Sequence, residues 1–237
     1  SAVALAEDFV NGEPFAVLFG DDVMYSDNGR PVIGQLIDIY EKYGKTVLGC
    51  KRVSMDDISK YASVEFDKIL ENDVYNMVKV TEKPKKEEAK SDLAPLGRYI
   101  CSPDIFDIIR TLKPGANNEY QFTDALDAEA HKNGAVAYVF HGTRYDMGDR
   151  LGYLKANIEY GLRDEELGGK LKGYLKEVGL NAEDYINREL NSSLSGGELK
   201  RIEIAMIRAR GTKLSLFDEP EAGIDLWSFS MLIKRFE

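Results

Sequence analysis

The chain has 237 residues, of which 43% are hydrophobic and 10% aromatic, enough to bury a globular core. Its apolar runs are all shorter than the roughly 20 residues of a membrane span, and its net charge of −10 argues against general affinity for nucleic acid. With only Cys50 and Cys101, and no CxxC spacing, neither a disulfide framework nor a zinc site is expected. A reducing cytoplasm is therefore the expected location.

Charge is unevenly distributed along the chain. Residues 1–168 carry 20 basic and 30 acidic side chains, whereas residues 169–237 carry 11 of each. This asymmetry indicates two segments of different origin. Ser1 is followed by no signal-peptide pattern, and we expect the sequence to begin inside a domain.

Strand and helix patterns alternate through the first segment, which predicts an α/β fold with a mostly parallel or mixed sheet. The apolar run at residues 14–20 favours a buried parallel strand, and the periodic spacing at residues 33–40 favours a helix ending at Gly44. Further strands are predicted at residues 46–50, 74–80, 97–101 and 136–140.

Three more helices are expected in this segment. The first has Ser102 as its cap and Pro103 at its first position, and the second has Thr123 with Asp124 as its cap and ends at Gly134. The third covers residues 149–162 and is expected to bury Leu151, Leu154 and Ile158. In the second segment we expect helices at 171–178 and 182–187, a long helix ending near 209 and a strand at 214–217.

Acidic side chains follow several of the predicted strands, with a lysine among them. Asp21 and Asp22 follow the first strand, Glu82-Lys83 another, and Asp146 a third. Two carboxylates that reach one Mg²⁺, with a lysine for phosphate, would suit phosphoryl transfer. Spacing alone leaves open that these acids are solvated loop residues.

Four blocks of sequence carry a family resemblance: EPFAVLFGDDVM, VTEKPKKEEAKSDLAPLGRYI, KPGANNEYQFTDAL and AYVFHGTRYDMGDRLGYLKANIEYGLR. From residue 1 to about 168 the chain resembles the bacterial UTP–glucose-1-phosphate uridylyltransferases, whose blocks occur in this order. The related thymidylyltransferases share some of these motifs, but residues 121–124 and 145–149 are more similar to the uridylyl branch.

The resemblance implies roles for particular residues. Asp21 and Asp146 would hold a catalytic Mg²⁺, Lys83 would contact the sugar phosphate, and Glu82 would accept hydrogen bonds from sugar hydroxyls. The implied reaction joins UTP and glucose 1-phosphate into UDP-glucose and pyrophosphate, by positioning and charge neutralisation rather than a covalent nucleophile. His131 and His141 are accordingly expected at surface or packing positions.

The first segment departs from the family at two places. The glycine-rich loop that wraps the nucleotide triphosphate in the family is not found in this sequence, so we expect little or no turnover from this chain. The family also has a tyrosine-glycine pair where this chain has Tyr61-Ala62, and the added methyl group lies where the sugar would approach.

A second constellation lies near the carboxyl end. Ser195-Gly196-Gly197 opens a predicted helix, where backbone N–H groups favour an anion, and an apolar strand ends in Asp218-Glu219. Together with Ala222-Gly223-Ile224-Asp225, these motifs resemble those of an ABC ATPase. Their sequence is most similar to the ATPase of the Suf iron–sulfur cluster assembly system. By that resemblance Asp218 would bind Mg²⁺, Glu219 would be the catalytic base, and Ser195, Gly196 and Gly197 would touch ATP held by a partner subunit.

The two segments therefore divide at 168–169 into a uridylyltransferase-like domain, residues 1–168, and a partial ABC ATPase, residues 169–237. The second lacks a GxxxxGK[ST] cradle, so we expect no ATP hydrolysis by the chain alone. Three interpretations remain: a uridylyltransferase with a foreign tail, which we favour, a genuine two-part protein, or a non-catalytic chain that binds a partner. A homo-oligomer is left open, and no nucleic acid or membrane partner is expected.

Overall fold

The computed structural model of the chain describes residues 2–113 and 120–177. The chain divides into two compact units, residues 1–153 and 154–237, and helix α5 (Arg150–Arg163) runs across the division. The ABC-like motifs at 195–197 and 218–225 lie outside the described residues. Within the described part of the chain, no helix is long and apolar enough to cross a membrane.

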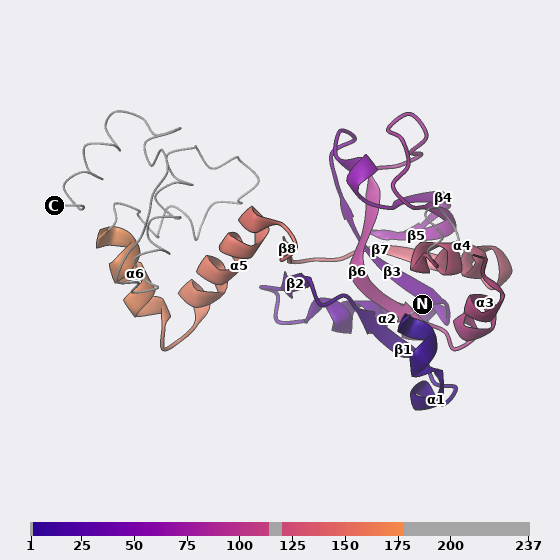
Figure 1. Cartoon of the computed structure of the whole chain (residues 1–237), viewed down its shortest axis with the longest axis horizontal. Coiled ribbons are helices and arrows are strands. Elements are labelled where there is room, and N and C mark those ends of the chain that lie inside the picture. The colour runs from indigo at the N-terminus through magenta and orange to yellow at the C-terminus, as the bar shows by residue number, and fades with distance from the viewer. Residues whose placement is uncertain (1, 114–119, 178–237) are drawn as a thin grey trace. The chain divides into compact units, whose positions relative to one another are not determined.

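The first unit is built on a six-stranded mixed sheet with helices packed against it (Figure 1). In spatial order the strands are β1 (Phe15–Leu18), β6 (Leu93–Cys101), β3 (Thr46–Arg52), β7 (Ala135–Val139), β5 (Val74–Thr81) and β4 (Ser63–Glu71). Only β3 and β7 pair in parallel, and every other neighbouring pair of this sheet is antiparallel. The α/β class is therefore confirmed, and the sheet is mixed rather than mostly parallel.

A separate two-stranded ribbon joins segments that are distant in sequence. Strand β2 (Asp22–Tyr25) pairs antiparallel with β8 (Thr143–Asp146), and Asp22 lies directly opposite Asp146. The chain enters this ribbon from β1 and leaves it toward α5. The ribbon places acids from both ends of the first unit together.

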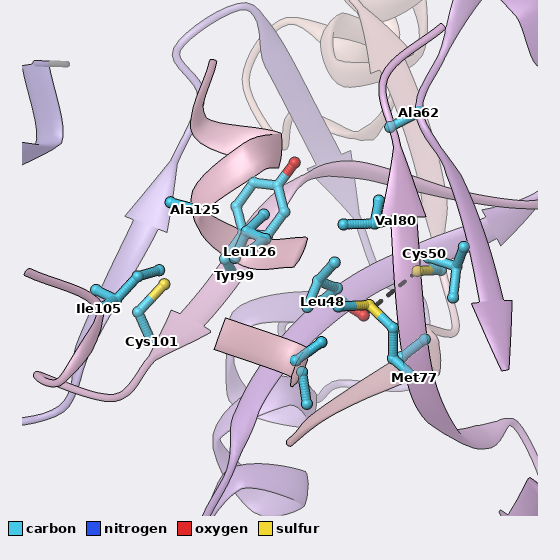
Figure 2. Packing of buried hydrophobic residues seen from close by; sticks show 14 of the residues in the cluster. Leu48, Cys50, Ala62, Met77, Val80, Tyr99, Cys101, Ile105, Ala125 and Leu126 are labelled. Carbon is cyan, nitrogen blue, oxygen red and sulfur yellow. Dashed lines mark hydrogen bonds between the residues drawn. The ribbon is translucent and has the colours of Figure 1, made fainter. Parts of the chain in front are cut away.

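Helices and two buried clusters complete the unit. Helix α2 (Val32–Tyr43) packs in a cluster with Val47 and Val136 of the sheet, while α3 (Ile105–Thr111) and α4 (Phe122–Lys132) pack in a larger cluster. Figure 2 shows the larger cluster, with Leu48, Cys50 and Met77 from strands and Ala125 and Leu126 from α4. The remaining short helices are η1 (Ala2–Ala6), α1 (Glu7–Val10) and η2 (Ile58–Lys60).

Several predicted elements are confirmed. Helix α2 ends at Gly44, whose φ of +63° is the left-handed conformation that suits glycine after a helix. Strands β3 and β5 cover the apolar runs that predict them, and β7 covers its predicted run except for the last residue, Phe140. His131 and His141 are exposed, and each lies beside a carboxylate, 3.7 Å from Asp127 and 3.6 Å from Asp73.

The first strand differs from the prediction of a buried parallel strand. Strand β1 is an edge strand, antiparallel to β6, and alternates between half-buried and exposed residues. A short run of apolar residues looks the same at an edge and in the centre of a sheet, because the pattern does not encode pairing.

Helix starts and buried faces also differ in detail. Helix α3 begins at Ile105 rather than at Pro103, and α4 begins at Phe122 without a side-chain cap. In α5 the buried residues are Ala156 and Leu162, while Leu151, Leu154 and Ile158 are only half-buried. The last described helix, α6 (Gly168–Glu177), follows a turn in which Asp164 Oδ1 accepts the N–H groups of Glu166 and Leu167.

Candidate functional site

Three carboxylates meet where the β2–β8 ribbon begins. Because Asp22 and Asp146 are direct cross-strand partners, their side chains share one face of the ribbon. Asp21 precedes β2, and its backbone carbonyl accepts the N–H of Met147 at 2.7 Å. An antiparallel ribbon thus brings together acids that the sequence shows only near the ends of separate predicted strands.

Asp21 and Asp146 both reach the space in front of Gly148. A Cβ placed on Gly148 would lie 3.2 Å from Asp146 Oδ1 and 3.9 Å from Asp21 Oδ2. The two oxygens are therefore no farther apart than the sum of those two distances. Asp146 Oδ1 also accepts the N–H of Gly148 at 3.0 Å, so this oxygen has a fixed direction.

Asp22 is enclosed and paired with an arginine. It is 7% exposed, and its Oδ1 accepts a hydrogen bond from Nε of Arg144. Burial raises the pKa of the Asp22 carboxyl and outweighs the opposing effect of the Arg144 charge and hydrogen bond. Burial lowers the pKa of Arg144, but the neighbouring carboxylates raise it. Asp22 contributes most to this increase, and the pKa of Arg144 is raised overall.

The Glu82-Lys83 pair lies at the end of β5 and has a defined geometry. Glu82 Oε2 accepts a hydrogen bond from Thr123 Oγ1 at 2.6 Å, so the residue predicted to cap α4 instead fixes this carboxylate. Lys83 has a φ of +41°, and its N–H donates to the carbonyl of Tyr61 at 3.1 Å. A left-handed backbone conformation is uncommon for lysine, and here it follows directly after the end of the strand.

Two tyrosines connect the carboxylate ribbon with the Glu82-Lys83 pair. The guanidinium carbon of Arg144 lies 5.6 Å from the ring centre of Tyr61, the residue whose carbonyl holds Lys83. Tyr99 is buried, and the charges of Asp22 and Glu82 both act on its hydroxyl; burial is the largest cause of its raised pKa. The Tyr99 ring also lies 5.5 Å from that of Phe19, near Asp21 in sequence, and 5.5 Å from that of Phe122, next to Thr123. The residues predicted separately as metal ligands and as sugar contacts therefore lie near one another.

Ala62 lies beside this neighbourhood but faces the core. It is 8% exposed and belongs to the larger buried cluster (Figure 2). Its predicted contact with the sugar stays a prediction. The predicted ABC residues Ser195, Gly196, Gly197, Asp218 and Glu219 lie outside the described residues.

Asp21 and Asp146 are the carboxylates of this site that could hold a magnesium ion together with a phosphate. Mg²⁺ in nucleotide enzymes is commonly held by one or two carboxylates, with phosphates and water as the remaining ligands. Among the described residues there is no cluster of three or more His, Cys, Asp or Glu side chains suited to a metal. The donor set therefore suits an ion shared with a phosphate substrate better than one fully enclosed by protein.

Sequence reasoning missed three parts of this arrangement: Arg144, the role of Thr123, and the closeness of Gly97 to Asp22. A Cβ on Gly97 would lie 2.1 Å from Asp22 Oδ2. Alternation along β8 could have placed Arg144 on the face of Asp146, because residues two apart on a strand point the same way. The other two contacts depend on tertiary packing.

Comparisons with known proteins agree with the fold of the first unit. The sequence profile described as nucleotidyl transferase matches residues 1–161. The chain belongs to the nucleotidyl transferase family. A second profile, described as ABC transporter, matches residues 109–222 and overlaps the first. Within the overlap, β7 pairs in the six-stranded sheet and β8 pairs with β2 in the ribbon, so both strands belong to the first unit.

Similar proteins include UTP–glucose-1-phosphate uridylyltransferases of Staphylococcus epidermidis and Bacillus subtilis. Each is 42% identical over 177 residues, or 75% of this chain and 60% and 59% of the relative, respectively. The chain therefore spans about three-fifths of the length of these relatives.

Solved structures of the same kind are also similar. A UDP-glucose pyrophosphorylase complexed with UDP-glucose is 39% identical, with a TM-score of 0.65, over 69% of this chain and 62% of that chain. A UTP-bound enzyme of Acinetobacter baumannii is 28% identical, with a TM-score of 0.67, over 74% and 60%.

Proposed function

We propose that residues 1–168 contribute the metal and sugar-phosphate side of a UTP–glucose-1-phosphate uridylyltransferase site. The observation that carries this proposal is the convergence of Asp21 and Asp146 in front of Gly148, joined through Arg144 and Tyr61 to Lys83. The relatives named for this reaction are 42% identical to the chain, which supports the choice of substrates.

In the proposed reaction, glucose 1-phosphate attacks the α-phosphorus of UTP and pyrophosphate leaves. Asp21 and Asp146 would hold Mg²⁺, which supplies a positive charge beside the transferring phosphoryl group. Lys83 would bind the sugar phosphate, and Glu82, oriented by Thr123, would accept hydrogen bonds from sugar hydroxyls. Positioning of this kind can accelerate the transfer without a covalent nucleophile.

The test measures UDP-glucose formation by the chain extended at its amino end with the glycine-rich nucleotide loop of a uridylyltransferase. We expect Mg²⁺-dependent UDP-glucose and pyrophosphate from UTP and glucose 1-phosphate. Lys83→Ala should lower the use of glucose 1-phosphate, whereas Lys85→Ala, an exposed lysine two residues away, serves as the matched control. Equal rates and affinities in the two variants would count against the assignment.

We propose that the second segment is the part of an ABC ATPase that completes a partner subunit's ATP site. The ABC transporter match, which reaches residue 222, supports this proposal. The sequence of its motifs favours the ATPase of the Suf system of iron–sulfur cluster assembly. The whole chain would then be a chimera of two protein families. We expect the chain alone to bind ATP no more tightly than roughly millimolar. Micromolar ATP binding that Asp218→Ala abolishes would instead make this segment a working site.

A further inference from the structure

Arg144 links two carboxylates of the ribbon with one guanidinium group. Its Nε donates to Asp22 Oδ1, and its Nη2 donates to Asp146 Oδ2 at 3.1 Å. The side chain of Arg144 is 15% exposed, and its guanidinium carbon lies 5.6 Å from the ring centre of Tyr61. The group is thus largely removed from water, where ion pairs are strong and geometry is well defined.

The two oxygens of Asp146 are used differently. Oδ2 is held by Arg144, while Oδ1 accepts the Gly148 N–H and faces the space that Asp21 Oδ2 also reaches. Fixing both oxygens sets the plane of the carboxylate. One lone pair of Oδ1 remains for a further partner on the Asp21 side.

Asp22 is excluded from that space by the same arginine. Its Oδ1 is bonded to Arg144, and its Oδ2 lies against Gly97, so the carboxylate is enclosed although it adjoins Asp21 in sequence. Three carboxylates and one guanidinium leave a net charge of −2, which matches one divalent cation. Of the three neighbouring acids, Asp22 is thus the one that is enclosed.

We propose that Arg144 is a positioning residue for the metal: it orients Asp146 toward Asp21 and keeps Asp22 out of the ligand set. This inference rests on the proposed function, because it concerns the cation of that site. Lysine cannot replace arginine here, since a single ammonium group cannot donate to both acids with a rigid planar fork.

The experiment measures Mn²⁺ binding to the full chain by titration calorimetry and by water-proton relaxation. The variants are Asp21→Asn, Arg144→Lys and, as a matched control, Arg52→Lys. Arg52 also bonds a carboxylate and lies 5.8 Å from a tyrosine ring centre, but its partners are Asp92 and Tyr75 rather than the carboxylates of the site. Thermal melts establish that each variant is folded at the temperature of the titration.

Loss of a residue that orients a metal ligand commonly weakens metal affinity about 10- to 100-fold, and we expect a loss of that size in Arg144→Lys. Bound Mn²⁺ should also relax water protons more strongly in this variant, because a water replaces the misdirected Asp146 oxygen. A purely structural role would lower the melting temperature without changing the relaxation. Arg52→Lys should keep the affinity of the wild-type chain.

The outcomes separate this inference from the proposed function. Unchanged Mn²⁺ affinity and relaxation in Arg144→Lys, with binding that still depends on Asp21, would overturn the role of Arg144 alone. Absence of Asp21-dependent Mn²⁺ binding in the wild-type chain would overturn the proposed function and this inference together.

Discussion

Replacing Gly97 with alanine tests whether the enclosed Asp22–Arg144 pair depends on the absence of a side chain on β6. Gly97 has a φ of +62°, and an added Cβ would lie 2.1 Å from Oδ2 and 2.9 Å from Cβ of Asp22. Rotation of the Asp22 side chain would move the oxygen but not the Cβ. The backbone of β2 would therefore have to shift, and the bond to Arg144 would shift with it.

The magnitude follows from comparison with Gly44, which has a φ of +63° and open space within 4 Å of its Cβ position. Gly44→Ala adds only the backbone strain, about 1–2 kcal/mol. Gly97→Ala adds the same strain and also disturbs a buried ion pair, and breaking such pairs costs about 3–5 kcal/mol. We therefore expect Gly97→Ala to be the more destabilising by about 3 kcal/mol.

Labelling of Cys50 and Cys101 with a thiol reagent in increasing urea measures the unfolding free energy of the sheet itself. Both cysteines are buried and free, they lie on β3 and β6, and they are the only two in the chain. Equal urea midpoints for the two alanine variants would refute the reasoning, because they would show that displacing Asp22 does not lower the free energy of unfolding.

Other predictions concern single contacts. Burial raises the pKa of Glu129, which is 0% exposed, so its contribution to stability is full below the usual glutamate pKa and is lost as pH rises through the folded value. Circular dichroism of urea unfolding should show that Glu129→Gln loses less stability than the wild-type chain between mildly acidic and neutral pH; parallel losses would contradict this. Arg98 donates to the carbonyls of Phe19, at 3.2 Å, and Asp22, at 2.5 Å, so Arg98→Met should weaken Mn²⁺ binding by releasing the segment that carries Asp21. Unchanged calorimetric affinity would exclude that role. In the extended chain, Thr123→Val should raise KM for glucose 1-phosphate and leave KM for UTP unchanged, because the bond to Glu82 is lost. An equal rise in both constants would argue against it.

Local patterns in the sequence predicted the elements better than their pairing. The spacing at residues 33–40 and the glycine after it were sufficient for α2, because amphipathic helices carry their own signal. The edge position of β1 was not predictable, since its run of apolar residues says nothing about neighbouring strands. For the same reason, the sequence did not predict that only one pair of neighbouring strands in the sheet is parallel.

The proposed members of the candidate site come from the sequence, whereas their geometry comes from the structure. Motif resemblance selected Asp21, Asp146, Glu82 and Lys83, and the structure links the segments that carry them through contacts of Tyr61 and Tyr99. The register that sets Asp22 opposite Asp146 joins residues far apart in the chain, and no local pattern encodes it. Sequence reasoning missed Arg144 because only the structure shows its hydrogen bonds to Asp22 and Asp146.

The central claim is that the carboxylates and the Glu82-Lys83 pair form one site for a metal and a sugar phosphate. The most direct measurement is the coupling between Mg²⁺ and glucose 1-phosphate binding to the full chain, by calorimetric titration of each in the absence and presence of the other. We predict that each ligand tightens the binding of the other by the same factor, on the order of 5- to 150-fold, and that Asp21→Asn abolishes the effect. Glucose 1-phosphate binding that is indifferent to Mg²⁺, or unaffected by Lys83→Ala, would contradict the account.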